Sequence, residues 1–334
     1  MRIALLGPIA WRTPPVHYGP WEQVTGLLAD GLADRGVDVT LFATADSQTR
    51  AHLESVAPHG YSEDDTMDGR VWEGLHVAHA LARSGDFDLV HNHLDWLPLC
   101  FSHSFAAPMV TTIHGFSGHG ILPAYLRAAS AYVSISDSDR ARELDYVATV
   151  HHGVDVDGLP FGRGGDALVS FGRIHPDKGT ADAITIARRA GRRLVICGIV
   201  HDREYFDAEV APHVDGDAVV FLGPVGPGDR SRVLGEAAAL LHPIGFDEPF
   251  GLSVVEAMVC GTPVVAYRRG SMPEVVDEGV TGFLVSGVDE AVPSVEVAAA
   301  LDRRRCRERA VQRFGATRMV EDYLEVYAGV LAPE

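Results

Sequence analysis

The most informative segment of the chain reads Phe246-Asp247-Glu248-Pro249-Phe250-Gly251-Leu252-Ser253-Val254-Val255-Glu256-Ala257-Met258. A short apolar run ends just before it, at His242-Pro243, so the segment starts as a loop and then becomes a helix between Gly251 and Ser253. The first amides of a helix lack partners within it and create a positive potential. The segment therefore predicts a strand, loop and helix that can hold a pyrophosphate without a metal ion.

Two carboxylates flank this predicted anion site. Glu248 lies in the loop ahead of the helix, and Glu256 lies about one turn inside it. They could hold sugar hydroxyls and ribose hydroxyls, respectively. Ser253 and Glu256 also have the spacing of a capping box, in which Glu256 would only cap the helix. Spacing alone leaves both roles of Glu256 open.

A second segment brings positive charge, and it reads Ser170-Phe171-Gly172-Arg173-Ile174-His175-Pro176-Asp177-Lys178-Gly179. It follows an apolar run, and ligands of open α/β sheets bind outside the carboxyl ends of strands. Arg173 offers a planar fork and Lys178 a point charge, which together could stabilise a departing diphosphate. Lys178 is the only lysine among 28 basic residues, which favours a special role. The alternative is a salt bridge of either cation with Asp177.

The rest of the chain alternates β-rich runs with helical patterns, which predicts parallel sheets built from βαβ units. A Gly- and Pro-containing stretch at 157–165 is typical of a linker. We therefore expect two doubly wound α/β domains, residues 1–157 and 166–315, and a last helix at 316–334 that closes the second domain or crosses back to the first. The expected strands are 3–9, 37–43, 89–93, 109–114, 132–136 and 149–153, then 168–173, 194–197, 219–222, 239–242, 264–267 and 282–285.

Composition excludes several classes of partner. The net charge of −18 argues against nucleic acid and against strong membrane association. No apolar run approaches the roughly 18 residues of a membrane span, and the first residues lack the pattern of an export signal. The four cysteines show no paired spacing, as expected for buried free thiols of a cytoplasmic protein. The sequence predicts no oligomeric state.

Taken in order, these motifs resemble the family 4 glycosyltransferases. The resemblance rests on Gly-Arg-x4-Lys-Gly followed about 70 residues later by Glu-x7-Glu, and it extends along the chain through residues 90–93, 112–115, 133–136, 152–155, 261–266 and 279–283. Each motif is weak alone, but their order and spacing are specific. The resemblance implies the GT-B fold, in which two Rossmann-like domains face each other across a cleft. The run at 11–22 resembles an actinobacterial subgroup, the antibiotic-pathway transferases.

The resemblance also implies an activity. It is the retaining transfer of a sugar from a nucleoside-diphosphate sugar, with UDP as the expected nucleotide, to a hydroxyl of a soluble acceptor such as a natural-product or oligosaccharide intermediate. No metal and no other cofactor are implied. The implied catalytic residues are His114, Arg173, Lys178 and Glu248, and the implied donor-binding residues are Gly19, Gly172, Arg173, Lys178, Val225, Glu248, Phe250, Gly251, Leu252 and Glu256.

One position departs from the family pattern. Family members often carry two adjacent glycines after the first strand, whereas here Pro20 follows Gly19. Pro20 has no N–H to donate, which puts a backbone contact from that position in doubt. Two alternatives stay open, an NDP-sugar epimerase of the same fold and a catalytically silent nucleotide-sugar binding protein.

Three other sequence patterns give weaker evidence of a functional site. Asp-x-Asp triplets occur at expected turns, where Asp is common for local reasons. His91 and His93, with Asp95 nearby, lack further ligands for a metal, which favours a polar wall. The glycines at 223–228 do not have the order of the dinucleotide fingerprint, so a nicotinamide cofactor is not expected.

Overall fold

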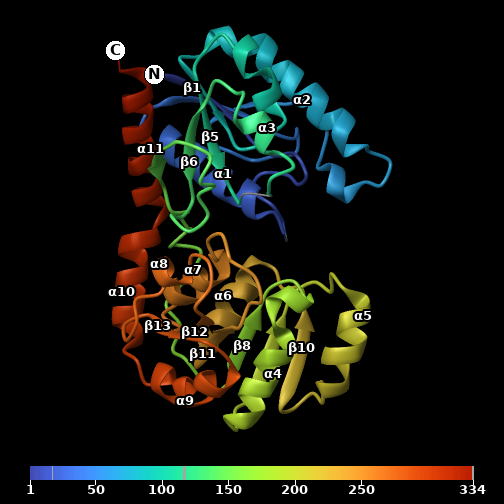
Figure 1. Cartoon of the computed structure of the whole chain (residues 1–334), viewed down its shortest axis with the longest axis vertical. Coiled ribbons are helices and arrows are strands. Elements are labelled where there is room, and N and C mark those ends of the chain that lie inside the picture. The colour runs from blue at the N-terminus through green and yellow to red at the C-terminus, as the bar shows by residue number, and fades with distance from the viewer. Residues whose placement is uncertain (17, 116–117, 333–334) are drawn as a thin grey trace. The chain divides into compact units, whose positions relative to one another are not determined.

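A computed structural model of the chain describes residues 1–16, 18–115 and 118–332. The chain divides into two compact units (Figure 1). The N-terminal unit consists of Met1–Gly153 together with the chain from Ala316 onward, and the C-terminal unit consists of Val154–Gly315. Each unit is built on one parallel sheet with helices against it. The predicted fold class, two Rossmann-like α/β domains, is confirmed.

The sheet of the N-terminal unit has seven strands in the order β3-β2-β1-β4-β5-β6-β7. Its paired strands are parallel, and β1 lies between β2 and β4. Because the strand order reverses beside β1, the loops after β1, β4 and β5 leave the sheet at the edge where doubly wound sheets bind ligands. The strands are β1 (Arg2–Leu6), β2 (Asp38–Phe42), β3 (His52–Glu54), β4 (Leu89–Asn92), β5 (Met109–Ile113), β6 (Ala131–Ser134) and β7 (Tyr146–Thr149).

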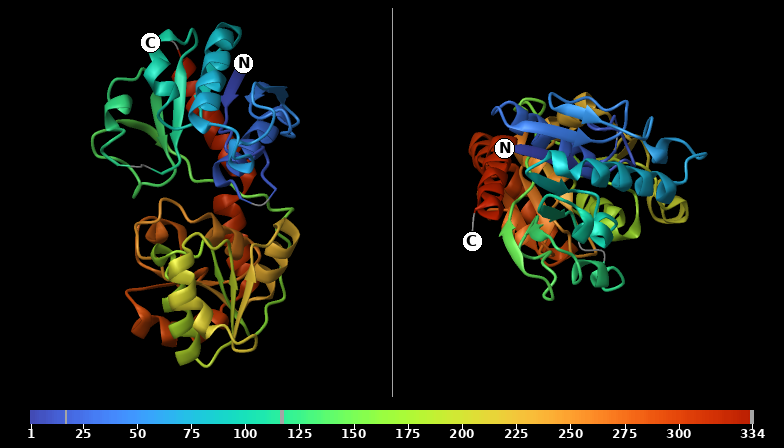
Figure 2. Two further views of the ribbon diagram at one scale, coloured as in Figure 1. Left: turned by 90° about the vertical axis from the view of Figure 1, so that its right-hand side faces the viewer. Right: turned by 90° about the horizontal axis from the view of Figure 1, so that it is seen from above.

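Helices cover this sheet because its strands are buried on both faces, as in other parallel sheets. The last helix of the chain, α11, packs beside α1 of this unit (Figure 2). Gly31 permits the close approach, since a Cβ there would lie 2.5 Å from a methyl carbon of Val320. The helices are α1 (Pro20–Ala33), α2 (Gly69–Arg83), α3 (Leu122–Tyr125) and α11 (Ala316–Leu331), with 3-10 turns η1 (Tyr61–Glu63), η2 (Ser84–Asp86) and η3 (Pro98–Ser104).

Two details of this unit differ from the sequence analysis. The strand expected at 149–153 forms earlier, at Tyr146–Thr149. The chain leaves the sheet because Gly153 passes α11 so closely that a Cβ there would lie 2.7 Å from the Cα of Ala316. For the last helix, the apolar spacing predicts a buried stripe of Met319, Tyr323, Val326 and Val330. In α11, however, Tyr327 is buried, while Val326 and Val330 are only half-buried. Tyr327 can be buried because its hydroxyl has a buried hydrogen-bond partner, His91.

The sheet of the C-terminal unit has six strands in the order β10-β9-β8-β11-β12-β13. They are β8 (Leu168–Phe171), β9 (Leu194–Cys197), β10 (Val219–Gly223), β11 (Ala239–His242), β12 (Val264–Tyr267) and β13 (Gly282–Val285). The strand order reverses at β8, between β9 and β11, so the loops after β8 and β11 are neighbours. Because each of these strands is a short apolar run, the sequence located all six to within about two residues.

The helical elements of this unit follow the strands in alternation. They are η4 (Pro176–Lys178), α4 (Thr180–Arg189), α5 (Arg203–Tyr205), the π-turn η5 (Phe206–Val210), η6 (Ala211–His213), α6 (Pro227–Glu236), α7 (Leu252–Val259), α8 (Met272–Val275), α9 (Val288–Ala299) and α10 (Arg303–Phe314).

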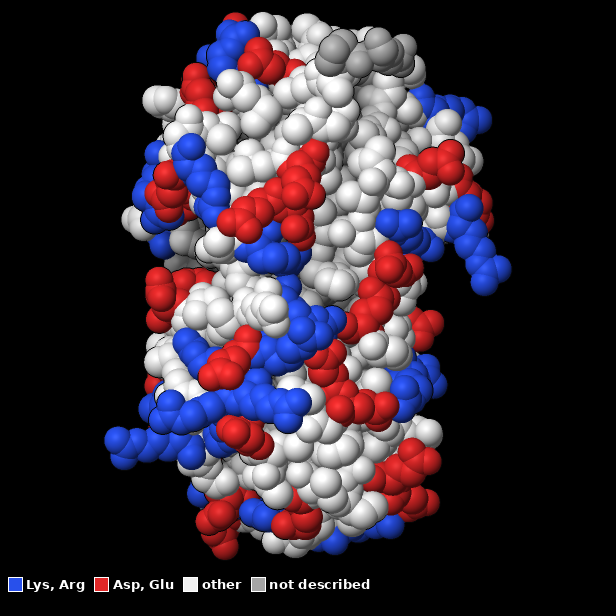
Figure 3. Space-filling view, turned by 90° about the vertical axis from the view of Figure 1, so that its left-hand side faces the viewer, with Lys and Arg blue, Asp and Glu red and all other residues white. Residues whose placement is uncertain are grey.

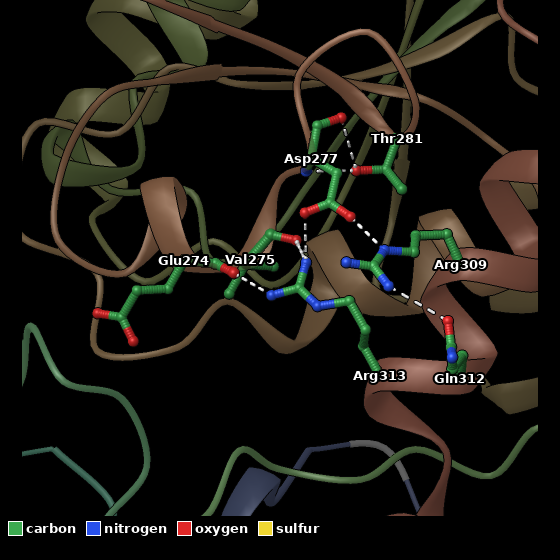
Figure 4. A network of polar contacts seen from close by, with 7 residues as sticks. All are labelled: Glu274, Val275, Asp277, Thr281, Arg309, Gln312 and Arg313. Atoms are coloured by element: carbon green, nitrogen blue, oxygen red, sulfur yellow. Dashed lines mark hydrogen bonds and ion pairs between the residues drawn. The ribbon is translucent and has the colours of Figure 1, made fainter.

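The arginines of α10 hold this unit together. Arg303 donates to the carbonyls of Gly162, Gly235 and Ala237. Farther along the helix, Arg309 and Arg313 both reach the carboxylate of Asp277 (Figure 4). Because they are bound to groups within this unit, these arginines are structural. On the face that Figure 3 draws, Lys and Arg side chains lie among Asp and Glu side chains.

The composition predicts buried free cysteines and no membrane-spanning segment. All four cysteines are free, and three are buried, whereas Cys100 is exposed. Across the described ranges, the structure contains no helix with the length and apolar character needed to cross a bilayer.

Candidate active site

The loop after β8 carries the two predicted cations of the C-terminal unit. Glycines shape it, because Gly172 and Gly179 have positive φ angles of 155° and 67°. A Cβ on Gly179 would lie 1.9 Å from the carbonyl oxygen of Pro243, so only glycine lets this loop pass the start of the loop after β11. The Gly245 amide then donates to the Asp177 carbonyl at 2.6 Å, which joins the two loops.

This junction brings Lys178 onto Glu248. Lys178 Nζ lies 2.8 Å from Glu248 Oε2 and 4.4 Å from the centre of the Phe246 ring. Their side chains are only 19% and 13% exposed, so the pair is partly desolvated. Lys178 therefore has a partner other than the Asp177 considered above, while an Arg173 nitrogen lies 3.8 Å from Asp177.

The charge of Glu248 is fixed by its neighbours. Burial alone would raise the pKa of its carboxyl, but His242 and Lys178 lower the pKa to about 2. His242 Nε2 lies 3.7 Å from Glu248 Oε2. Glu248 is thus a carboxylate at any ordinary pH and an acceptor for hydroxyl groups.

The loop after β11 ends at a helix start. Gly251, with φ 90°, is the N-cap of α7, and no side chain caps this helix. Ser253 lies inside the helix, so the capping box with Glu256 does not form. A Cβ on Gly251 would lie 3.6 Å from Glu248 Cγ, which places the start of α7 directly beside the Lys178–Glu248 pair. The amides of Leu252 and Ser253, in the first turn of α7, have no hydrogen-bond acceptor within the helix, and Phe250 is buried just ahead of them.

Glu256 instead pairs with a residue that the sequence analysis missed. Arg230 of α6 lies 3.0 Å from Glu256, and their side chains are 18% and 4% exposed. The Arg230 guanidinium also lies 5.4 Å from the centre of the Phe171 ring, at the end of β8. The available signal was a cation in the first turn after the Gly223–Gly226 loop. Val225 lies half-buried in that same loop, ahead of α6.

In the N-terminal unit, His114 follows β5 and belongs to a row of buried histidines. His93 Nδ1 lies 2.9 Å from His114 Nε2, and His93 Nε2 lies 3.2 Å from His91 Nδ1. On the other side, His114 Nδ1 lies 3.2 Å from His152 Nε2. His93 follows β4 directly and lies on the same face as His91, as the sequence predicts. Both side chains are fully buried, so they form an interior polar row and not the exposed polar wall that the sequence favours.

Helix α11 anchors this row. The Tyr327 hydroxyl lies 2.7 Å from His91 Nδ1, and the Tyr323 hydroxyl lies 2.7 Å from the Thr112 hydroxyl. Burial lowers the pKa of His114 to about 3, so its ring is neutral near pH 7. A neutral imidazole next to other neutral rings both accepts and donates a hydrogen bond.

The start of α1 faces His114 from a different loop. The Trp21 ring stacks on His114, with centroids 5.2 Å apart and planes at 20°. Gly19, with φ 148°, is the N-cap of α1, and Pro20 occupies the first helical position, where no N–H is needed. Within the described residues, no group of three or more His, Cys, Asp or Glu side chains is arranged to hold a metal ion.

Comparison with known proteins now gives a family. The model for Glycosyltransferase Family 4 matches residues 22–157, and the model for glycosyl transferases group 1 matches residues 159–313. Together they account for most of the chain. The chain belongs to the family 4 glycosyltransferases. The resemblance stated from the motifs is therefore confirmed, and with it the GT-B architecture.

Similar proteins support this assignment. Glycogen synthase of Mycobacterium tuberculosis (strain ATCC 25618 / H37Rv) is 28% identical over 409 residues, covering 100% of this chain and 97% of that protein. D-inositol 3-phosphate glycosyltransferase of Mycolicibacterium smegmatis is 28% identical, covering 90% and 84%. The crystal structure of AviGT4, a glycosyltransferase involved in avilamycin A biosynthesis, is 26% identical with a TM-score of 0.79, covering 100% and 99%. This last likeness agrees with the subgroup indicated by residues 11–22.

Proposed function

We propose that this family 4 glycosyltransferase transfers a sugar from a UDP-linked donor, with retention of configuration, to a hydroxyl of a soluble acceptor. One observation carries the proposal. The only lysine of the chain, Lys178, meets Glu248 at the uncapped start of α7, with Arg173 in the same loop. Within the C-terminal unit, the cations therefore lie next to the first amides of α7 and to the Glu248 carboxylate.

The donor diphosphate fits the positive part of this cluster. Arg173 and Lys178 offer charged donors, and the α7 amides at Leu252 and Ser253 offer neutral ones. Because Gly172 has no side chain, the diphosphate can come close to the backbone there. The carboxylate of Glu248 then accepts hydroxyls of the donor sugar. Because protein groups supply the positive charge, the proposed reaction needs no metal ion.

The nucleoside end fits the groups next to α6. Glu256, held by Arg230, accepts the two ribose hydroxyls, and Val225 contacts the base from the loop before α6. For His114, whose ring is neutral, and for Gly19 at the start of α1, the family resemblance implies a role in donor binding, and the proposal includes both.

The chemical step is a substitution on one face of the sugar. The bond from the anomeric carbon to the diphosphate oxygen breaks, and the bond to the acceptor oxygen forms on the same side. The acceptor hydroxyl loses its proton to the departing diphosphate. Arg173 and Lys178 stabilise the negative charge that grows on that leaving group.

The test is a titration followed by product analysis. UDP, in the presence of EDTA, should raise the melting temperature of the chain by mass action, more than GDP, ADP, dTDP or NAD. With UDP-glucose and an acceptor, proton NMR should show an α-linked product, as in the donor. A β-linked product would contradict retention, and a shift that EDTA abolishes would contradict the metal-free site.

The same assay separates the two alternatives. An epimerase would convert the donor sugar without any acceptor, and a silent binding protein would bind UDP but release no product from the donor. Release of UDP that depends on an added acceptor distinguishes the transferase from both.

A further inference from the structure

A second pocket lies wholly within the N-terminal unit, and none of the residues with a predicted role except Gly19 lines it. Its volume is about 370 Å³, which suits one sugar-sized ring. It is formed by the loops after β1 and β4, the start of α1 and the side of α2. Three of the four tryptophans and three carboxylates line it: Trp11, Trp21, Trp96, Glu22, Glu73 and Asp95.

The three carboxylates accept hydrogen bonds from neutral donors. Glu22 accepts from the Trp11 amide at 3.1 Å, and Glu73 accepts from the Tyr61 hydroxyl at 2.8 Å. Asp95 accepts from the Tyr125 hydroxyl, and its backbone has the left-handed φ of 69°. Asn92 holds that turn by donating to the Asp95 carbonyl.

Positive charge is scarce around these acids. None of the described residues that line the pocket is Lys or Arg, and Arg70 lines only an adjoining hollow with Tyr61 and Glu73. Burial raises the pKa of Glu22 to about 7 and raises the pKa of Glu73 and of Asp95. Among the described residues that line the pocket, these partly buried acids therefore have no cationic partner, although burying an unpaired charge is unfavourable.

The pocket adjoins His114. Trp21 lines the pocket, and its ring stacks on His114, which is the residue of this unit expected beside the reacting sugar. One side chain thus contacts both the pocket and His114. This position suits the acceptor.

We propose that this pocket binds the acceptor, and that the acceptor is a sugar or cyclitol ring that carries a basic amino group and no phosphate. The inference rests on the proposed function. Indole faces pack against the C–H faces of such a ring and attract a cation. The carboxylates bind its hydroxyls and its ammonium group by charge-assisted hydrogen bonds. A phosphate would add a further anion beside Glu22, Glu73 and Asp95, which opposes binding.

Tryptophan fluorescence provides a direct test. A Trp72→Phe variant leaves only the three pocket tryptophans, so each response reports on this site. The probes are D-glucosamine, D-glucose and D-glucose 6-phosphate, titrated at saturating UDP. We expect glucosamine to bind about tenfold more tightly than glucose, as for one added ion pair, with glucose 6-phosphate weakest. No response, an equal response to all three rings, or a preference for the phosphate would overturn the inference.

A matched pair of variants localises the effect. In the same background, Glu73→Gln keeps the acceptor for Tyr61 but removes the charge, so glucosamine affinity should fall about tenfold while glucose affinity changes little. Glu63→Gln removes the same charge from an exposed site outside the pocket and should change neither. Equal losses in both variants would overturn the inference. UDP binding is measured separately: its absence contradicts the proposed function, whereas normal UDP binding without amine preference contradicts the inference alone.

Discussion

Nζ of Lys178 lies 2.8 Å from Oε2 of Glu248, although 70 residues separate them in the chain. Two loops hold them together through the Gly245–Asp177 hydrogen bond and through the absence of a side chain at Gly179. The pair joins a positive charge to a carboxylate of low pKa at the start of a helix. This arrangement is the basis of the donor site that we propose.

Replacing Lys178 should remove most of the activity. In Lys178→Ala, kcat/KM for the donor should fall about a hundredfold or more, because a positioned cation on the leaving group is lost. Arg189→Ala is the control, since Arg189 makes an exposed ion pair with Asp289 in the same unit. Initial rates of UDP release measure both variants. Near-normal turnover in Lys178→Ala would contradict the role assigned to this residue.

Glu256 should discriminate donors by their ribose. Glu256→Gln keeps the shape of the side chain, and its UDP affinity should fall about tenfold, as expected for a lost charge-assisted hydrogen bond. A UDP analogue without ribose hydroxyls should bind wild type and variant equally. Calorimetric titration measures this, with Glu236→Gln of the exposed Arg232–Glu236 pair as the control. An equal loss for UDP and the analogue would place Glu256 outside the ribose site.

The buried histidines should make the protein acid-sensitive. Burial lowers the pKa of His114 to about 3 and of His76 to about 4, and it lowers the pKa of His91, His93 and His152 well below the usual value. Between about pH 6.5 and the lowered pKa values, the unfolded chain binds more protons than the folded one, so stability is lost as pH falls. Each histidine contributes up to about 1.4 kcal/mol per pH unit in that window.

Three carboxyl groups act in the opposite direction. Burial raises the pKa of Glu22 to about 7 and also raises the pKa of Glu73 and of Asp95, so the folded chain takes up these protons first and is stabilised as pH falls toward their ordinary values. The five histidines outnumber these three acids, so we expect a net destabilisation. Thermal unfolding between about pH 7.5 and pH 5 measures the slope. A melting temperature that stays constant or rises over this range would contradict neutral, buried rings.

The Asp277 network should stabilise the C-terminal unit without touching the site. Arg313 donates to the Asp277 carboxylate at 2.8 Å and to the carbonyls of Glu274 and Val275 (Figure 4). Arg313→Met should lower the free energy of unfolding by about 1–3 kcal/mol, because it leaves buried acceptors unsatisfied. Urea unfolding and UDP affinity are compared with wild type. Unchanged stability would show that water replaces these bonds at no cost.

Local pattern was enough to predict much of this molecule. The strands β8 to β13 are apolar runs bounded by turns, so the sequence predicts where each strand ends. The proposed donor-site residues follow these carboxyl ends, which in a parallel sheet lie at one edge. Arg230 was missed because its local signal, a cation soon after the Gly223–Gly226 loop, does not separate it from Arg232 in the same helix, and only the packing of α6 against α7 brings it to Glu256. The acidic pocket draws on four separate segments, and Asp95 enters it through a left-handed turn that local sequence does not encode.

The most direct test of the donor site uses the single lysine of the chain. Growth on lysine labelled with ¹³C at Cε labels Lys178 alone, so its NMR signal is unambiguous. If the account is correct, UDP in the presence of EDTA will shift this signal to saturation at the affinity found by calorimetry, and Glu256→Gln will weaken the same titration. A signal that saturating UDP leaves unmoved, or that moves only after a divalent cation is added, would contradict a metal-free diphosphate site at Lys178.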